Sequence, residues 1–225
     1  MIKAVIFDID DTLYDFRNAN VAAITAVADY AEKELGIGAE EFRELHKKTM
    51  ADAKQRMGDV AASHNRLIRY QTILESRGLP LHPHALRMYE IYWRSILDTA
   101  KPFAGVREMM EELHSRGIRI GIGTDMTAYI QFRKLERMEL LAFVDFLVSS
   151  EEASAEKPAP VFFARCVEKA LCSAEECLFV GDNLKKDVRG AMHAGLHAAW
   201  YRPQGMDPEE DVPQITDFSE IFGLL

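Results

Sequence analysis

The feature that most constrains the fold is a regular alternation of helix and strand patterns after Lys101. Segments with apolar residues at a spacing of three or four alternate there with short apolar runs. The expected strands cover 118–124, 145–150, 177–182 and 197–201, and the expected helices cover 106–117, 127–138, 158–171 and 185–195. Such alternation is typical of right-handed βαβ crossovers, so the sequence predicts an α/β fold with a parallel sheet.

A helical block interrupts this pattern directly after the first strand. Residues 3–8 form a short β-branched and aromatic run, which predicts a buried strand of a parallel sheet. From about Arg17 to Ala100, apolar residues recur at helical spacing in four segments separated by glycines and Pro83. We therefore predict a core formed by residues 1–16 and 101–225 and an all-helical domain formed by residues 17–100. The tail after Pro203 is expected to be a loop before a short closing helix.

Composition and charge narrow the classes of partner. Hydrophobic residues make up 48% of the 225 residues, and no run of eighteen apolar residues is present that would span a bilayer. The net charge is −9 without a basic run, so neither a nucleic acid polymer nor a membrane is expected as a partner. The sequence lacks a secretory signal pattern, and its three cysteines match no zinc or disulfide spacing. We therefore expect a cytoplasmic protein, either a monomer or a homodimer.

Polar residues gather at the carboxyl ends of four expected strands. In an open parallel sheet the binding crevice lies beyond these ends. The candidates in chain order are Asp8, Asp10, Thr12, Thr124, Asp125, Lys157, Asp182 and Asp187. Carboxylates can converge in a crevice if a divalent cation neutralises them, and ligands that are all oxygen favour Mg²⁺. The sequence therefore predicts Mg²⁺ as the cofactor.

These residue types suit phosphoryl transfer. Asp8 can attack phosphorus as a carboxylate nucleophile, and Asp10 can protonate the leaving oxygen and then activate water. Such acid–base help is worth roughly a hundredfold to ten-thousandfold in rate. Thr124 and the N–H groups at the start of the following helix can hold phosphate oxygens, and Lys157 can offset the charge that builds up during transfer.

At these residues the sequence resembles the haloacid dehalogenase (HAD) superfamily of aspartate-nucleophile hydrolases. Four motifs match in the family's order: D-x-D-x-T at Asp8, Asp10 and Thr12, the hydroxyl at Thr124, the lysine at Lys157, and GDNLKKD at Asp182 and Asp187. Each motif is weak alone, but together they are specific and they cover nearly the whole chain.

The resemblance implies a Rossmann-like core with a helical cap domain inserted between the first and second motifs. It also implies a phosphoaspartate at Asp8, and Mg²⁺ held by the side chains of Asp8 and Asp182 and the backbone carbonyl of Asp10. A cap that closes over the substrate excludes water, so residues 17–100 are expected to set much of the specificity.

Some residues are assigned to substrate binding only because they lie near the motifs, and the roles of others stay open. The candidate phosphate- and substrate-binding residues are Thr12, Asp15, Arg17, Thr124, Asp125 and Lys157. Asp125 stands where many relatives carry Asn, so its charge is acceptable beside a phosphate only if it points away or pairs with a cation. Asp187 has either a metal-linked role or the role of a carboxylate favoured by a helix dipole. The cluster His64, Arg66, Arg69 and Tyr70 either faces the substrate or is solvated helix surface.

The leading functional hypothesis is an Mg²⁺-dependent phosphomonoester hydrolase acting on a small cytosolic metabolite such as a nucleotide or sugar phosphate. A phosphomutase of the same fold would differ in how well the cap excludes water. A 2-haloacid dehalogenase needs no carboxylic acid at position 10, so Asp10 argues against it. A phosphoacceptor signalling receiver, from another class, is disfavoured by the helical insert of about eighty residues.

Overall fold

A computed structural model describes residues 1–225, and its contacts divide the chain into two compact units. The first, here called the core unit, comprises Met1–Asp15 and Lys101–Leu225. The second, here called the helical unit, comprises Phe16–Ala100.

The core unit is built on a six-stranded sheet whose paired strands are all parallel. The strands are β1 Ala4–Phe7, β2 Arg119–Thr124, β3 Phe146–Ser149, β4 Cys177–Gly181, β5 His197–Tyr201 and β6 Gln214–Ile215, in the order β3-β2-β1-β4-β5-β6. All four residues of β1 are buried, as expected of a central strand with both faces covered. The predicted α/β fold with a parallel sheet is confirmed.

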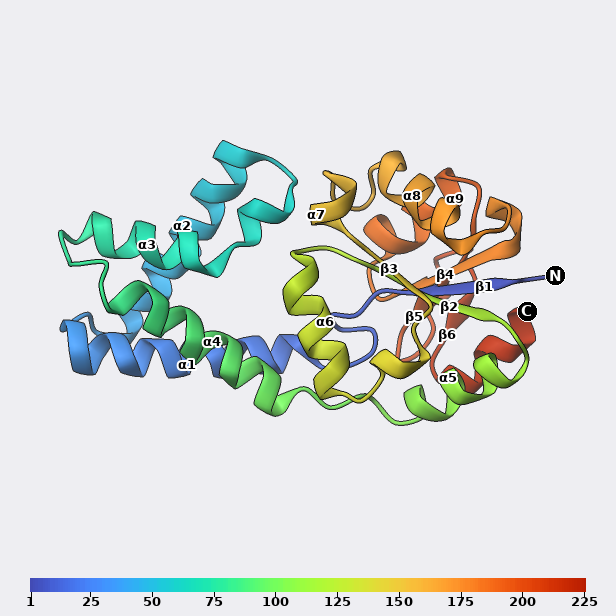
Figure 1. The fold of residues 1–225 in the computed structure, drawn as a ribbon, viewed down its shortest axis with the longest axis horizontal. Helices are drawn as coiled ribbons and strands as arrows, with labels where there is room; N and C mark the ends of the chain where they lie inside the picture. Colours follow the sequence, from blue (N-terminus) through green and yellow to red (C-terminus); the bar gives the residue numbers. More distant parts are fainter. The chain divides into compact units, whose positions relative to one another are not determined.

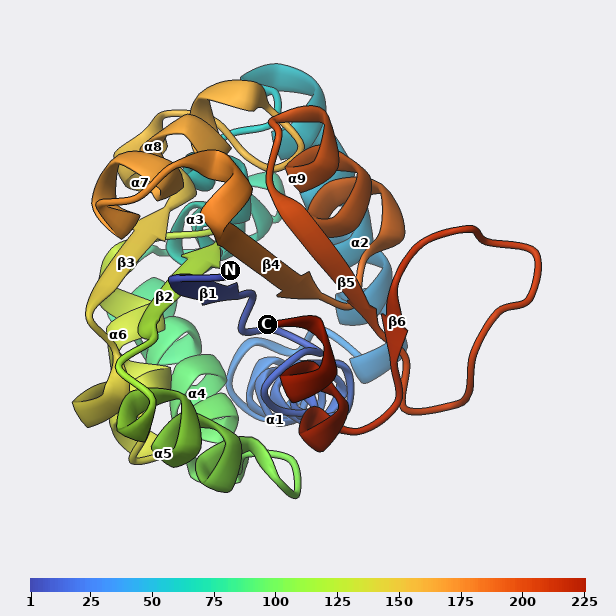
Figure 2. The same cartoon turned by 90° about the vertical axis from the view of Figure 1, so that its right-hand side faces the viewer.

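Helices cover both faces of this sheet (Figure 2). They are α5 Val106–Ser115, α6 Ala128–Arg137, the short α7 Ser150–Ala153, α8 Pro160–Ala170 and the short α9 Gly190–His193. In Figure 2, α8 and α9 lie on one side of the strands and α5 and α6 on the other. A buried apolar cluster joins the sheet to α8, where the rings of Phe163 and Phe179 meet edge to face with centroids 5.4 Å apart.

Three elements of the core unit differ in some respect from the sequence prediction. The tail after Pro203 includes β6, which pairs with β5 through Tyr201 and Ile215, where only a loop was predicted. Two residues carry too little alternation to be recognised as a strand. The expected helix over 185–195 begins as a π-helical segment, Leu184–Arg189, before α9. The predicted closing helix is a 3₁₀ helix at Phe218–Leu224.

The helical unit contains four helices and one 3₁₀ turn (Figure 1). The helices are α1 Phe16–Leu35, α2 Ala39–Met57, α3 Arg66–Ser76 and α4 His84–Thr99, and the turn covers Ala61–His64. Helices α1 and α4 make the most extensive contact, and α1 buries mainly small side chains, including Ala23, Ala28 and Ala31. Across the whole chain, no helix combines the length and apolarity needed to cross a membrane.

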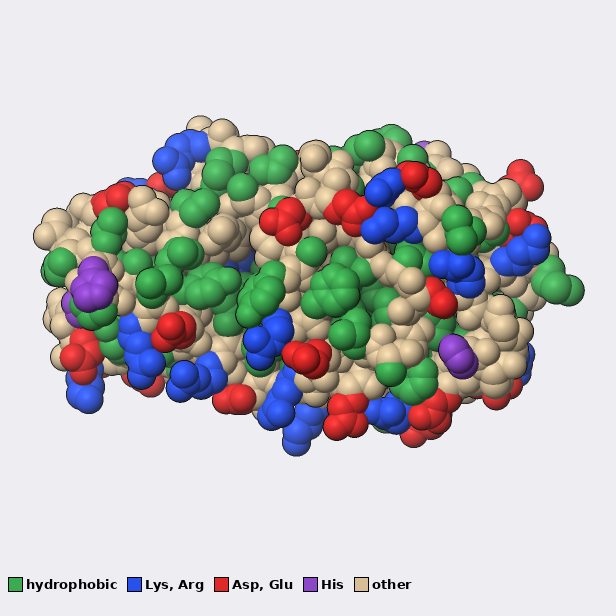
Figure 3. Space-filling view, viewed as in Figure 1, with side chains coloured by type: hydrophobic (Ala, Val, Ile, Leu, Met, Phe, Trp, Pro, Cys, Tyr) green, Lys and Arg blue, Asp and Glu red, His purple; other side chains and the backbone are tan.

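Charged side chains of both signs are interspersed on the face drawn in Figure 3. Lys and Arg side chains lie among Asp and Glu side chains there, with hydrophobic areas between them. This face therefore offers no continuous basic stripe of the kind that binds a nucleic acid backbone.

Candidate active site

Three adjacent strands bring distant polar residues to one edge of the sheet. Asp8 directly follows β1, Thr124 ends β2, and Asp182 directly follows β4. The register sets Phe7 opposite both Ile122 and Val180, and the N–H of Asp8 donates to the carbonyl of Val180 at 2.9 Å. The candidate residues therefore lie beyond the carboxyl ends of the strands, where parallel sheets bind ligands.

Three aspartates form a cluster at this edge. One carboxylate oxygen each from Asp8, Asp182 and Asp187 lies within 4.8 Å of the others. Asp8 and Asp187 are buried and Asp182 is half-buried. Three carboxylates so close to one another, with oxygen as the only donor, fit a divalent cation such as Mg²⁺.

Burial, with a smaller effect of the neighbouring acids, raises the pKa values of Asp8 and Asp182. Burial raises the pKa of Asp8 well above its usual range, and Asp187 and Asp182 add to the effect while Lys157 opposes it. Burial, followed by the charges of Asp187 and Asp11, raises the pKa of Asp182 to about 7. A cation bound among these groups would reverse the preference, because it favours the charged carboxylates.

Lys157 supplies a fixed positive charge within the cluster. Its Nζ lies 2.7 Å from Oδ1 of Asp8 and 2.7 Å from Oδ1 of Asp187, and it donates to the carbonyl of Gly123 at 3.0 Å. Burial works against the charged ammonium, but Asp187 and Asp8 outweigh it, and the pKa of Lys157 is raised well above its usual range. Lys157 is therefore a permanent cation beside Asp8.

Asp187 is held in place by its own π-helical segment and by a glycine. Its Oδ2 accepts a hydrogen bond from the N–H of Asn183 at 2.9 Å, while its Oδ1 faces Lys157. A Cβ at Gly181 would overlap the Asp187 carboxyl group, so the close approach requires glycine. Asp187 is 1% exposed, and it contacts both Lys157 and the residue that precedes the π-helical segment, so both roles considered for it stay predictions.

Asp10 is bound by a lysine that the sequence reasoning missed. Nζ of Lys134, on α6, donates to both carboxylate oxygens of Asp10 at 2.6 and 2.8 Å. The Lys134 side chain is fully buried, and its Nζ also lies 5.7 Å from the ring centroid of Tyr14. The available signal was a lysine on the helix face that also carries the buried Ile130 and Leu135.

Thr124 also accepts a hydrogen bond from a residue of α6, Gln131. Nε2 of the fully buried Gln131 donates to Oγ1 of Thr124 at 2.8 Å and to the carbonyl of Asp125 at 2.7 Å. The hydroxyl of Thr124 donates to the carbonyl of Asp125 at 3.3 Å. Gln131 and Lys134 lie three positions apart, so one helix face positions both Thr124 and Asp10.

Asp125 pairs with a cation, Lys186. Such a pairing is one of the two arrangements that make the negative charge of Asp125 acceptable beside a phosphate. Its Oδ2 accepts from Nζ of Lys186 at 2.8 Å, and its Oδ1 accepts from the backbone N–H of Lys157 at 3.1 Å. Lys186 also reaches Oε2 of Glu156 at 3.2 Å. The sequence reasoning missed Lys186, although it lies inside the GDNLKKD motif.

The remaining candidates are placed in three different ways. Thr12 is fully buried, and its hydroxyl accepts a hydrogen bond from the N–H of Asp182 at 3.0 Å, so it positions the Asp182 backbone. Asp15 is the last residue of the first segment of the core unit, and Arg17 lies in the first turn of α1. Their contact with a substrate stays a prediction.

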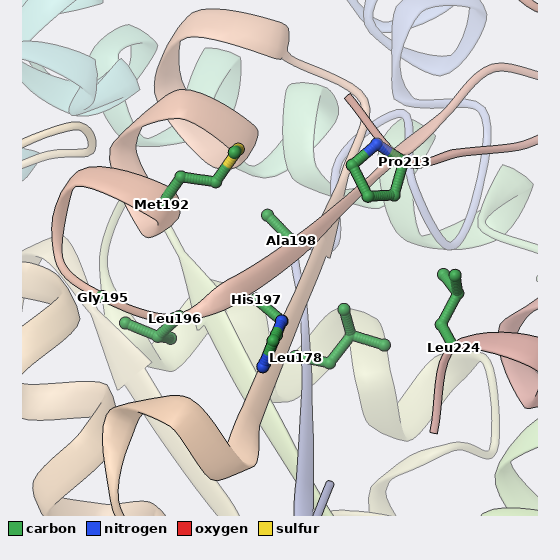
Figure 4. A pocket seen from close by; sticks show the side chains of 8 residues that line it. All are labelled: Leu178, Met192, Gly195, Leu196, His197, Ala198, Pro213 and Leu224. Carbon is green, nitrogen blue, oxygen red and sulfur yellow. The ribbon is translucent and has the colours of Figure 1, made fainter. Parts of the chain in front are cut away.

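A pocket elsewhere in the core unit does not share this chemistry (Figure 4). It is lined by Leu178, Met192, Gly195, Leu196, His197, Ala198, Pro213 and Leu224. Leu178 and His197 stand near the beginnings of β4 and β5, away from the strand ends that carry the acids. No carboxylate lines this pocket, so the acidic cluster is the better candidate site.

Comparison with known proteins agrees with this geometry. Residues 5–201 match the family described as "Haloacid dehalogenase-like hydrolase". A ribulose-1,5-bisphosphate 5-phosphatase of Halopiger xanaduensis is 35% identical over 96% of this chain and 90% of its own length. A glyceraldehyde 3-phosphate phosphatase of Methanopyrus kandleri is 32% identical over 96% of this chain and 92% of its own length.

Solved structures show the same fold. A 2-haloacid dehalogenase from Pseudomonas syringae pv. Tomato superposes with a TM-score of 0.82 at 26% identity, covering 100% of this chain and 98% of the other. A HAD phosphatase from Thermococcus onnurineus superposes with a TM-score of 0.75 at 24% identity, covering 99% and 97%. Fold and sequence thus define a hydrolase whose core is a parallel β-sheet covered by helices. The chain belongs to the haloacid dehalogenase-like hydrolases, as the motifs predicted.

Proposed function

We propose that the protein is an Mg²⁺-dependent phosphatase that hydrolyses the phosphate monoester of a small sugar phosphate through a phosphoaspartate at Asp8. The observation that carries this proposal is the position of Asp8, which touches Lys157 and lies within 4.8 Å of two further carboxylates. The names of the two relatives described above support a phosphorylated sugar as the substrate class.

The side chains of Asp8 and Asp182 and the backbone carbonyl of Asp10 would hold the metal ion, with Asp187 beside them. When bound, Mg²⁺ would neutralise the cluster and stabilise the negative charge of the transferring phosphoryl group. Thr12 would keep the Asp182 backbone in place through its 3.0 Å hydrogen bond.

The protein's own residues would carry the two chemical steps. An oxygen of Asp8 would form a bond to phosphorus while the bond from phosphorus to the alcohol oxygen breaks, and Asp10 would give its proton to that oxygen. Asp10 would then take a proton from water as the water attacks phosphorus and Asp8 is released. Lys157 would hold Asp8 and offset the charge that develops on the phosphoryl oxygens.

Two alternatives of the same fold give different products. A phosphomutase would return the phosphoryl group to a sugar, and a 2-haloacid dehalogenase would release halide from carbon. The carboxyl group at position 10 favours phosphoryl transfer, because halide needs no protonation when it leaves. Membership of the hydrolase family argues against a signalling receiver.

We also propose that the helical unit acts as the cap that excludes water and selects the substrate. The protein would work in the cytoplasm, as a monomer or homodimer, without a nucleic acid or membrane partner.

Release of inorganic phosphate from a panel of sugar phosphates and nucleotides, with and without EDTA, tests the proposal. We expect turnover with Mg²⁺, and loss of at least a thousandfold in Asp8→Asn, because that variant lacks the nucleophile. Asp52→Asn is a matched control, since Asp52 is exposed on α2. Full turnover by Asp8→Asn or in EDTA would contradict the mechanism.

A further inference from the structure

The interior of the helical unit holds a polar cluster that the proposed chemistry does not use. His46 on α2 is 5% exposed, and Arg66, Arg69 and Tyr70 on α3 are 6%, 3% and 0% exposed. Of the two alternatives given for this cluster, solvated helix surface is therefore wrong for Arg66, Arg69 and Tyr70. Helical periodicity did not reveal the burial of these arginines, because the pattern counts an arginine as polar on either face of the helix.

One edge of the Arg69 guanidinium has no hydrogen-bond partner. Nη1 of Arg69 lies 3.2 Å from Nε2 of His46, whereas Nε and Nη2 are buried without a partner. The hydroxyl of Tyr70, the next residue, is also buried without a partner. Buried polar groups in proteins nearly always have a hydrogen-bond partner, so three unpaired donors in one cluster point to a missing partner.

The Arg69 guanidinium also carries a buried positive charge. Burial, followed by the charge of Arg66, lowers the pKa of Arg69 to about 10, so the group stays charged at neutral pH. Burial, followed by Arg69 and Arg66, lowers the pKa of His46 to about 3, so its ring stays neutral. The groups that act most strongly on Arg69 are Arg66, Tyr70 and Tyr92. Buried charges are ordinarily paired, so Arg69 is expected to have an anionic partner.

We propose that Arg69 and the Tyr70 hydroxyl bind an anionic group, a phosphate or a carboxylate, inside the helical unit. Nε and Nη2 are the two donors of a guanidinium that form parallel hydrogen bonds to two oxygens of one such group. His46 holds the opposite edge through Nη1, which fixes the plane of the guanidinium. Arg66 adds charge and is itself oriented by bonds to the carbonyl of His64 at 2.7 Å and to the Tyr92 hydroxyl at 2.9 Å.

The anion has two possible sources that share this chemistry. One is a second anionic group on the phosphorylated substrate, which rests on the proposed function and makes the substrate a sugar bisphosphate or a sugar phosphate with a carboxylate. The other is a separate small anion such as inorganic phosphate. An experiment with two arms distinguishes them.

The first arm compares kcat/KM for a sugar bisphosphate and for the corresponding monophosphate. If the substrate supplies the anion, Arg69→Met lowers kcat/KM for the bisphosphate about tenfold to a hundredfold more than for the monophosphate, because a charge-assisted hydrogen bond is worth about 1.5–3 kcal/mol. Arg69→Lys, which keeps the charge but loses the paired donors, restores part of the difference. Arg77→Met, an exposed arginine paired with Glu41, is the matched control.

The second arm titrates inorganic phosphate into the Asp8→Asn protein by calorimetry, with and without Arg69→Met. A separate anion predicts two bound phosphates that fall to one when Arg69 is replaced. It also predicts that phosphate raises the melting temperature of the wild-type protein more than that of Arg69→Met.

The proposal is overturned if Arg69→Met leaves both the substrate ratio and the number of bound phosphates unchanged. It is also overturned if Arg69→Met lowers the melting temperature in phosphate-free buffer and reduces kcat/KM equally for both substrates, since that describes a purely structural arginine. Absence of phosphatase activity in the wild-type protein would refute the proposed function alone, because the phosphate titration tests the anion site without turnover.

Discussion

Replacing Lys134 by methionine tests whether the buried ammonium positions Asp10 for acid–base chemistry. Methionine fills similar space but donates no hydrogen bond, so both bonds to Asp10, at 2.6 and 2.8 Å, are lost. The Asp10 side chain is 21% exposed and water replaces part of what it loses. Hydrogen bonds to charged groups are worth about 1.5–3 kcal/mol, so we expect a net loss of about 1–3 kcal/mol in the free energy of unfolding.

The effect on rate depends on the leaving group. A positioned general acid raises the rate by about a hundredfold to ten-thousandfold. Without the hydrogen bonds from Lys134, Asp10 should lose about tenfold to a hundredfold of this contribution to kcat. A sugar alcohol is a poor leaving group and needs the proton from Asp10. p-Nitrophenolate leaves without it, so Lys134→Met should change kcat for p-nitrophenyl phosphate by less than about threefold.

Steady-state kinetics on both substrates, with denaturant unfolding of each variant, measure these effects. Lys169→Met is the control, because Lys169 forms a partly exposed ion pair with Glu152. In an Asp10→Asn background, Lys134→Met should add little further loss, because the two residues act as a unit. Equal losses of kcat on both substrates, or additive losses in the double variant, would refute the positioning role of Lys134.

Two further predictions concern the acidic cluster. The pKa of Asp182 is raised to about 7 without metal, so below this pH Mg²⁺ must displace a proton, and its apparent affinity should fall up to about tenfold per pH unit. The rise in melting temperature on adding Mg²⁺ should therefore be larger at about pH 8 than at about pH 6, and an equal rise at both would contradict it. Gly181→Ala should weaken Mg²⁺ binding and activity at least tenfold, because the added Cβ displaces the Asp187 carboxyl group. The control Gly38→Ala has open space around its Cβ and should change neither. Calorimetry measures Mg²⁺ binding, and phosphate release measures activity.

Much of the fold could be predicted because its signals are local. Strands such as β1 and β4 are short apolar runs, and the helices between them show helical periodicity over ten or more residues. The strand β6 could not be predicted, because two residues show no alternation and its pairing with β5 is non-local.

The candidate site was predictable where a residue lies in a motif and not where it acts across the fold. Asp8 and Asp182 follow buried strands, so their meeting follows from the rule that ligands bind beyond strand ends. Lys134 reaches Asp10 across 124 positions of the chain. Lys186 reaches Asp125 across 61 positions. Each looks like an ordinary helix lysine, and only the packing of its helix shows the carboxylate it pairs with.

The most direct test is to find where the phosphoryl group resides during turnover. The protein is mixed with substrate and Mg²⁺, quenched in acid within milliseconds, digested, and its peptides are weighed by mass spectrometry. The proposed mechanism predicts one phosphoryl group on the peptide that contains Asp8, present with Mg²⁺ and absent with EDTA. A phosphoryl group on another residue, or turnover that leaves Asp8 unmodified at every quench time, would contradict it.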